Sequence, residues 1–135
     1  MSLSSNPSIV IVHVYEPVAE NMLALPLREA GFPILAISHQ KENLIPLLTQ
    51  HQPDILIVNL SFYDPDVRLA LAERFPQLKV VVVTVMGSDG YFATLAKYLF
   101  EKGHAHAFIC LSDTYDLVTA VGGVARNELY LSQSQ

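Results

Sequence analysis

Five short apolar runs recur along the chain, and each is rich in β-branched residues. They span residues 9–14, 34–37, 55–58, 80–85 and 107–111. Runs of this length and composition are typical of β-strands. Their apolar residues are continuous and do not alternate with polar ones, which is the pattern of strands buried on both faces. The pattern therefore predicts five strands in a parallel sheet, with helices covering each side.

The segments between these runs carry helical spacing and helical end signals. Asp64-Pro65 is the clearest start, because aspartate can cap free amides and proline suits the first helical position. Ser88-Asp89 begins a later helix that ends at Gly103, and Ser112 or Asp113 begins a last one that we expect to run to about Leu129. This alternation predicts an α/β domain of five βα units joined by right-handed crossovers.

Two prolines fall inside helical patterns, where proline removes a backbone hydrogen bond. Pro46 is compatible with the second helix if that helix begins at Asn43. Pro26 lies deeper in the first pattern, so we expect a kink or a break between Leu25 and Leu27.

Size and composition indicate one compact domain. The chain has 135 residues, of which 51% are hydrophobic and 16% charged, so it can bury a substantial core. We assign residues 9–131 to this domain. Residues 1–8 are expected to be a disordered N-terminal segment or residues added to the natural chain, and residues 132–135 a polar tail or the start of a linker.

Charge and cysteine content narrow the function classes. The net charge of −5, with 8 scattered Lys and Arg residues, offers no basic surface for direct nucleic-acid binding. Cys110 is the sole cysteine, so no internal disulfide can form, and we expect it to be a buried residue of the fifth strand and not a nucleophile. No apolar run approaches the roughly 18 residues of a membrane span. A cytoplasmic protein without membrane contact is expected.

In an open parallel sheet, ligands bind beyond the carboxyl ends of the strands. The predicted strand ends place the following residues there: Val14, Tyr15, Glu16, Ser38, His39, Asn59, Leu60, Ser61, Thr84, Val85, Cys110, Leu111 and Ser112. We expect Asn59 to hydrogen-bond Thr84 and nearby backbone, which would hold this pocket in one state. His104 and His106 could suggest a metal site or a pH sensor, but they lack a third ligand nearby in sequence and are expected to be ordinary loop histidines.

Three segments, in their order and spacing, carry a resemblance to a known family. They are Gln52-Pro53-Asp54 before the third strand, Arg74-Phe75-Pro76 before the fourth, and residues 120–132 (AVGGVARNELYLS) at the end. Over nearly all of residues 9–132 the chain resembles a response-regulator receiver domain of the LuxR/NarL type. The resemblance implies a flavodoxin-like, doubly wound, five-stranded parallel sheet in the order 2-1-3-4-5.

The same resemblance implies where phosphorylation chemistry should lie, and this chain departs from it. Receivers use an acidic pair after the first strand to hold magnesium, and aligning the chain on Pro17 places Val14 and Tyr15 there. Asn59 stands at the position of the aspartate that accepts the phosphoryl group, and an amide is a poor nucleophile. Glu16 and Asn59 would give a metal ion only one carboxylate and one amide, which is too few ligands for Mg²⁺, so no metal or cofactor is expected.

Two further receiver positions follow the fourth and fifth strands. Thr84 stands where receivers carry a threonine or serine after the fourth strand. It is either a surviving switch residue or an ordinary threonine at the end of a strand. Cys110, or Leu111 if the preceding loop is longer by one residue, replaces the lysine and cannot pair with a phosphoryl group.

We therefore interpret the chain as a pseudo-receiver, not an enzyme, that acts in signal transduction or transcriptional regulation through protein contacts, independently of aspartyl phosphorylation. The resemblance implies a contact face on the fourth helix, fifth strand and fifth helix, made here by Tyr91, Tyr98, Lys102, His106, Tyr115, Arg126 and Tyr130. The partner would be another protein, an attached effector domain or a second copy in a homodimer.

Two alternatives remain open. The chain could be the regulatory part of a LuxR-type DNA-binding transcription factor whose helix-turn-helix lies beyond Gln135. It could also be a small-molecule sensor that uses the vacant acidic pocket around Tyr15, Glu16, Asn59 and Thr84.

Overall fold

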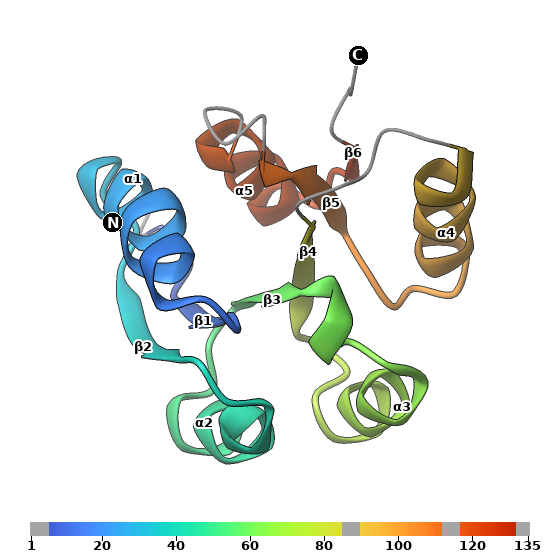
Figure 1. Ribbon diagram of the computed structural model, residues 1–135, viewed down its shortest axis with the longest axis horizontal. Helices are drawn as coiled ribbons and strands as arrows, with labels where there is room; N and C mark the ends of the chain where they lie inside the picture. The colour runs from blue at the N-terminus through green and yellow to red at the C-terminus, as the bar shows by residue number, and fades with distance from the viewer. Residues whose placement is uncertain (1–5, 85–89, 112–116, 132–135) are drawn as a thin grey trace.

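A parallel sheet forms the centre of the computed structural model, which describes residues 6–84, 90–111 and 117–131 (Figure 1). Its strands are β1 (Ile9–Val12), β2 (Ile34–Ser38), β3 (Ile55–Asn59), β4 (Lys79–Thr84), β5 (Ala107–Cys110) and β6 (Tyr130–Leu131). They lie in the order β2-β1-β3-β4-β5-β6, and every neighbouring pair is parallel. The predicted parallel α/β architecture is thus confirmed, with a sixth strand that was not expected.

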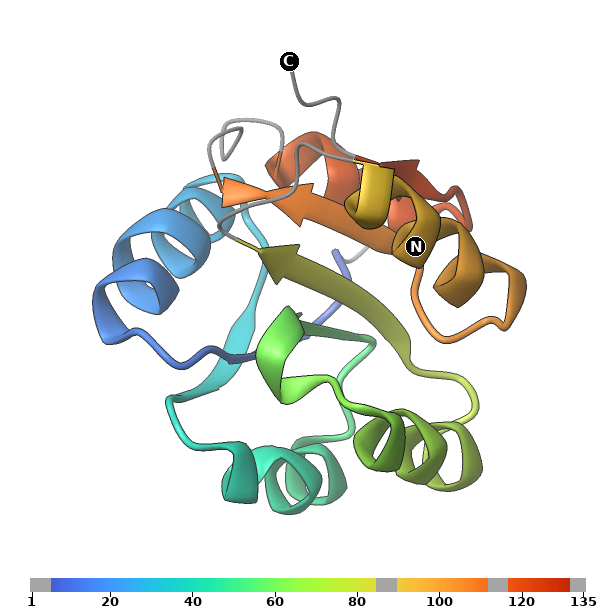
Figure 2. The same cartoon turned by 45° about the vertical axis from the view of Figure 1, so that its right-hand side comes forward.

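Helices cover both faces of this sheet (Figures 1 and 2). The π-helix η1 (Val18–Ala24), α1 (Leu25–Glu29) and α5 (Leu117–Ala125) pack on one face. The other face carries α2 (Leu44–His51), α3 (Pro65–Arg74) and α4 (Gly90–Glu101). Two 3₁₀ turns, η2 (Lys41–Asn43) and η3 (Leu60–Phe62), lead out of the ends of β2 and β3.

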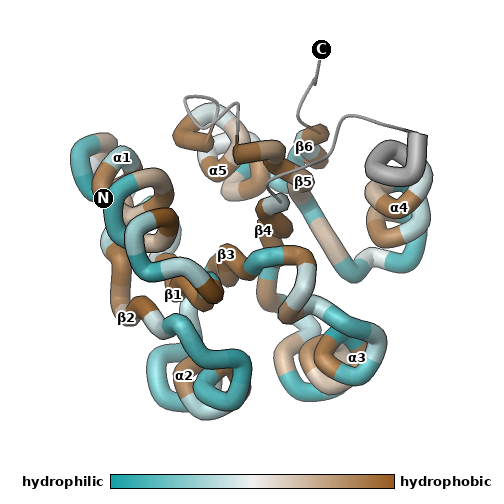
Figure 3. Tube along the Cα trace, viewed as in Figure 1, coloured by the Kyte–Doolittle hydropathy of each residue, from teal (hydrophilic) through white to brown (hydrophobic). Residues whose placement is uncertain are grey.

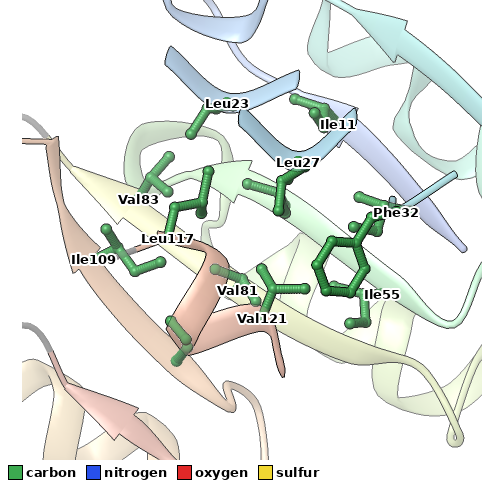
Figure 4. Close-up of a cluster of buried hydrophobic side chains, with 14 of the residues drawn as sticks. Ile11, Leu23, Leu27, Phe32, Ile55, Val81, Val83, Ile109, Leu117 and Val121 are labelled. Carbon is green, nitrogen blue, oxygen red and sulfur yellow. The ribbon is translucent and has the colours of Figure 1, made fainter. Parts of the chain in front are cut away.

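Two hydrophobic cores result, because successive strand side chains point to opposite faces of the sheet. Ile11, Ile57 and Val81 face η1, α1 and α5, in the core drawn in Figure 4. Their sequence neighbours Val12 and Val58 face α2, α3 and α4. The central residues of the strands are accordingly apolar, as the hydropathy colouring of Figure 3 shows.

The first helix changes its type beside Pro26, where the sequence predicts a kink or a break. The seven residues before Leu25 form a π-helix, in which the Leu25 amide donates to the Glu20 carbonyl five residues back. Pro26 then occupies the first turn of α1, where its missing N–H matters least. The wider π turn removes the conflict between the proline ring and the preceding turn, so the helical path continues from η1 into α1.

Other helix boundaries largely follow the sequence signals. The Asp64 carboxylate accepts a hydrogen bond from the Val67 amide at 2.9 Å and caps α3, as predicted. Pro46 lies in the first turn of α2, next to the expected start at Asn43. Gly103 has the left-handed φ of +73° that the predicted helix end requires. The proposed caps at residues 88–89 and 112–113 lie outside the described residues.

The last helix is shorter than predicted, and the sheet gains β6 for that reason. Asn127 adopts a left-handed φ of +68°, and the amides of Asn127 and Glu128 donate to the carbonyls of Val124 and Gly123. This pair of bonds is a Schellman motif, which ends a helix. The chain then turns back, and the Tyr130 amide donates to the His106 carbonyl beside β5. The prediction of five strands and a helix to Leu129 was therefore wrong.

The start of the described chain is tied to the domain. The Asn6 side chain donates to the Gly31 carbonyl, and the Ser8 amide donates to the Asp54 carboxylate at 2.9 Å. Residues 6–8 thus make defined contacts, unlike the disordered segment that the sequence led us to expect. Within the described ranges, no helix is long and apolar enough to cross a membrane.

Candidate functional site

A cavity of about 350 Å³ opens at the carboxyl ends of β1, β3 and β4. This is the edge of a parallel sheet at which ligands bind. Its walls are formed by residues that directly follow these strands or end them: His13, Val14, Tyr15, Asn59, Leu60, Ser61, Val83 and Thr84. None of these side chains carries a carboxylate or a permanent positive charge.

Asn59 ends β3 and is the structural centre of this cavity. Its side chain is only 5% exposed. The Val14 amide donates to Asn59 Oδ1 at 3.1 Å, and Asn59 Nδ2 donates to Ser61 Oγ at 2.6 Å. Because the Val14 N–H can only donate, these contacts fix which end of the amide faces β1. Asn59 thus joins the loop after β1 to the loop after β3.

The Asn59 side chain bonds the Val14 amide and Ser61 Oγ, so the expected link to nearby backbone is present. Thr84 lines the same cavity from the end of β4. A bond between these two side chains stays a prediction, and both residues line one cavity.

His13 lies in this cavity, and sequence reasoning treated it only as part of a strand. β1 ends at Val12, and the pairing of Val12 with Val58 makes His13 level with Asn59. The residues that directly follow β1 are therefore His13 and Val14, ahead of Tyr15. A polar residue next to the candidate site at the end of an apolar run was the signal that could have revealed it.

The His13 ring is 2% exposed and is held in one orientation. The Tyr15 amide donates to its Nδ1 at 3.1 Å, and His39 Nδ1 lies 3.2 Å from the His13 carbonyl oxygen. Burial, followed by the nearby His39 ring, lowers the pKa of His13. At neutral pH the ring is therefore uncharged, with its proton on Nε2, because Nδ1 is an acceptor.

The other predicted site residues lie differently. Val14 and Tyr15 line the cavity, and the Tyr15 side chain is 59% exposed at its mouth. Glu16 is exposed and does not line the cavity. Cys110 is buried at the end of β5, paired in register with Thr84, and is not part of the cavity wall. In the described part of the chain, no three His, Cys, Asp or Glu side chains gather as a metal site.

The predicted contact face is only partly exposed. Tyr98 is 49% exposed on α4, with Lys102 Nζ 5.8 Å from its ring centre. Arg126 is exposed and pairs with Glu128 at 3.2 Å. His106 and Tyr130 are half-buried, since they join β4, β5 and β6 through backbone and imidazole hydrogen bonds. The Tyr91 side chain and Tyr115 lie outside the described residues.

No protein-family model and no curated protein matches the sequence. Solved structures do match the fold. A LuxR-family two-component response regulator from Aurantimonas sp. SI85-9A1 superposes with a TM-score of 0.77 at 21% identity, covering 93% of this chain and 89% of that one. The fold is that of response-regulator receiver domains.

Receiver domains of RcsB match equally well. The isolated RcsB receiver domain from Salmonella enterica serovar Typhimurium, solved with the phosphomimetic BeF₃⁻, gives a TM-score of 0.78 at 15% identity, with 93% of each chain covered. A structure of two RcsB dimers bound to two parallel DNAs gives 0.74 at 16% identity, covering 93% of this chain and 64% of that one. At these identities the likeness concerns the receiver fold alone.

Proposed function

We propose that this chain is a pseudo-receiver, which has the receiver fold but transmits signals without aspartyl phosphorylation. One observation carries the proposal. Among the described residues, those that line the cavity at the carboxyl ends of β1, β3 and β4 carry an amide, hydroxyls, an imidazole and apolar groups, and no carboxylate.

Phosphoryl transfer depends on charge positioned around a metal ion. Mg²⁺ prefers carboxylate oxygens, and the residues from His13 to Tyr15, which follow β1 and line the cavity, supply none. Asn59 cannot form an acyl phosphate because its amide is a neutral, poor nucleophile, and its Oδ1 already accepts a hydrogen bond from the Val14 amide. These features support a pocket that has lost the reaction, and we propose that the chain does not act as an enzyme.

The test is incubation with acetyl phosphate and Mg²⁺, followed by intact mass measurement. The expected result is an unchanged mass. The variant Asn59→Asp should behave in the same way, because the metal-binding carboxylates after β1 remain absent. A stoichiometric, acid-labile gain of one phosphate in the wild-type protein would refute the proposal, and labelling of Asn59→Asp alone would show that the pocket still holds the metal.

The pseudo-receiver would then act through contacts with another protein or an attached domain. Tyr98 and Lys102 on α4 support this part of the proposal, since an exposed tyrosine beside a cation is a common centre of protein interfaces. β6 lies at the edge of the sheet next to β5 and fills part of the expected face (Figure 1). The contact surface is therefore centred on α4 and not on β5.

A homodimer through α4 is testable by sedimentation velocity over a wide concentration range. Tyr98→Ala should weaken self-association at least tenfold. Leu69→Ala removes a similarly exposed side chain from α3 and should leave it unchanged. Equal behaviour of the two variants would exclude a dimer through α4.

We also propose a second candidate, the regulatory part of a longer DNA-binding regulator. It is favoured by the match to the RcsB dimer–DNA structure, of which this chain covers 64%. The receiver itself, with net charge −5, would not contact DNA. Sequencing the natural gene past codon 135 tests this candidate, because a stop codon there would leave no place for a DNA-binding domain.

A further inference from the structure

The buried ring of His13 leaves one polar atom without a protein partner. Its Nδ1 accepts from the Tyr15 amide, so the neutral ring carries its proton on Nε2. Within the described ranges, His13 Nε2–H donates to no protein acceptor, although the residue is 2% exposed and lines the cavity. A buried donor without an acceptor is costly, so the site favours an occupant that supplies one.

Neighbouring side chains in the cavity also carry donor hydrogens that could bond an acceptor on a ligand. Asn59 Nδ2 gives one hydrogen to Ser61 Oγ and keeps a second. Ser61 Oγ is an acceptor in that bond, so its own hydrogen remains available. The cavity wall therefore offers several uncharged donors from His13, Asn59 and Ser61. Such donors suit a carbonyl oxygen, which can accept two hydrogen bonds.

The rest of the wall sets the charge and shape of the occupant. Val14, Leu60 and Val83 supply apolar surface, and the exposed Tyr15 ring offers a flat face at the mouth. No lysine or arginine lines the cavity among the residues that the structure describes, so a buried anion would lack a counter-charge there. The volume of about 350 Å³ lies within the range of small-ligand sites, which is about 300–1,000 Å³.

We propose that this cavity binds an uncharged, flat, carbonyl-bearing small molecule, whose oxygen accepts from His13 Nε2–H and whose ring packs on Tyr15. The inference rests on the proposed function, because a pocket that holds Mg²⁺ and a phosphoryl group would be too polar for such a ligand. Binding would join the loops after β1 and β3, which Asn59 already links.

The test uses benzamide as probe and benzoate as its charged counterpart, followed by NMR of backbone amides and of the imidazole rings. Benzamide should cause saturable shifts at His13, Val14, Asn59 and Thr84, with a dissociation constant on the order of 1 mM. Benzoate should bind at least tenfold more weakly. No saturable shift, or equal binding of benzoate, would overturn the proposal.

Variants identify the groups responsible. His13→Phe keeps a flat ring but removes the donor, and it should abolish benzamide binding, whereas His104→Phe in the distant loop should have no effect. Tyr15 is exposed, so Tyr15→Ala can be made without disturbing the core, and it should weaken binding at least threefold. Full binding in both His13→Phe and Tyr15→Ala would refute the site.

The benzamide titration tests the ligand, and the acetyl phosphate experiment tests the pseudo-receiver proposal, so a negative result in one does not decide the other. Absence of benzamide binding with an unchanged mass would leave the pseudo-receiver proposal standing and remove only the ligand. Phosphorylation of the wild-type protein would refute the pseudo-receiver proposal, and with it the ligand proposal that rests on it.

Discussion

Truncating Asn59 to alanine tests whether this side chain holds the pocket together. The change removes the acceptor for the Val14 amide, 3.1 Å away, and the donor to Ser61 Oγ, 2.6 Å away. A hydrogen bond contributes about 1 kcal/mol net, and an amide left without its acceptor adds to the loss. The Val14 side chain is partly exposed, so water can reach this loop and limit that penalty. We expect a total loss of about 2 kcal/mol in the free energy of unfolding.

Urea denaturation followed by circular dichroism measures this loss. Ser61→Ala removes only the second hydrogen bond, at an exposed residue, and should cost less than about 1 kcal/mol. Asn59→Asp keeps an acceptor for the Val14 amide, so its loss in the free energy of unfolding should lie between those of Asn59→Ala and Ser61→Ala. If Asn59→Ala changes the free energy of unfolding by less than about 0.5 kcal/mol, the linking role assigned to Asn59 is refuted.

Further predictions concern the rest of the domain. Tyr63→Phe removes the buried hydroxyl that donates to the His104 carbonyl, so it should cost about 1–2 kcal/mol in urea denaturation, and no loss would disprove that bond. Gly122→Ala should stabilise α5 by about 0.5–1 kcal/mol, because an added Cβ meets only ordinary contacts, the nearest at 3.6 Å; a lower thermal midpoint would contradict this. Burial lowers the pKa of His13 and His106 from 6.5, so the unfolded chain binds more protons below that pH; stability should fall as pH drops from 7 towards 5, and a flat profile between those pH values would contradict the buried neutral rings.

Much of the fold could be predicted because its signals are local. Continuous β-branched runs located all five main strands, and Asp64-Pro65 located the start of α3. The end of the chain failed because its signal is not local. Asn127 provides a left-handed turn that glycine more often supplies, and β6 exists only because Tyr130 meets the edge of β5.

The site was predicted in part for the same reason. Asn59 follows one apolar run, and Val14 and Thr84 lie at the ends of two others, so the rule for parallel sheets placed them at one edge. His13 was missed because five of six residues in its run are apolar, and nothing local shows that β1 ends before it. Its partnership with Tyr15 depends on the turn that follows β1.

The central claim is that the receiver fold here lacks phosphorylation chemistry. Titration with beryllofluoride and Mg²⁺, monitored by ¹⁹F NMR and by backbone amide shifts, tests it most directly because beryllofluoride mimics the phosphoryl group on an aspartate. If the pocket has lost its phosphorylation site, no bound ¹⁹F resonance and no shift at Val14, Asn59 or Thr84 will appear. A bound resonance at stoichiometric beryllofluoride, together with shifts at Asn59 and Thr84, would contradict the account.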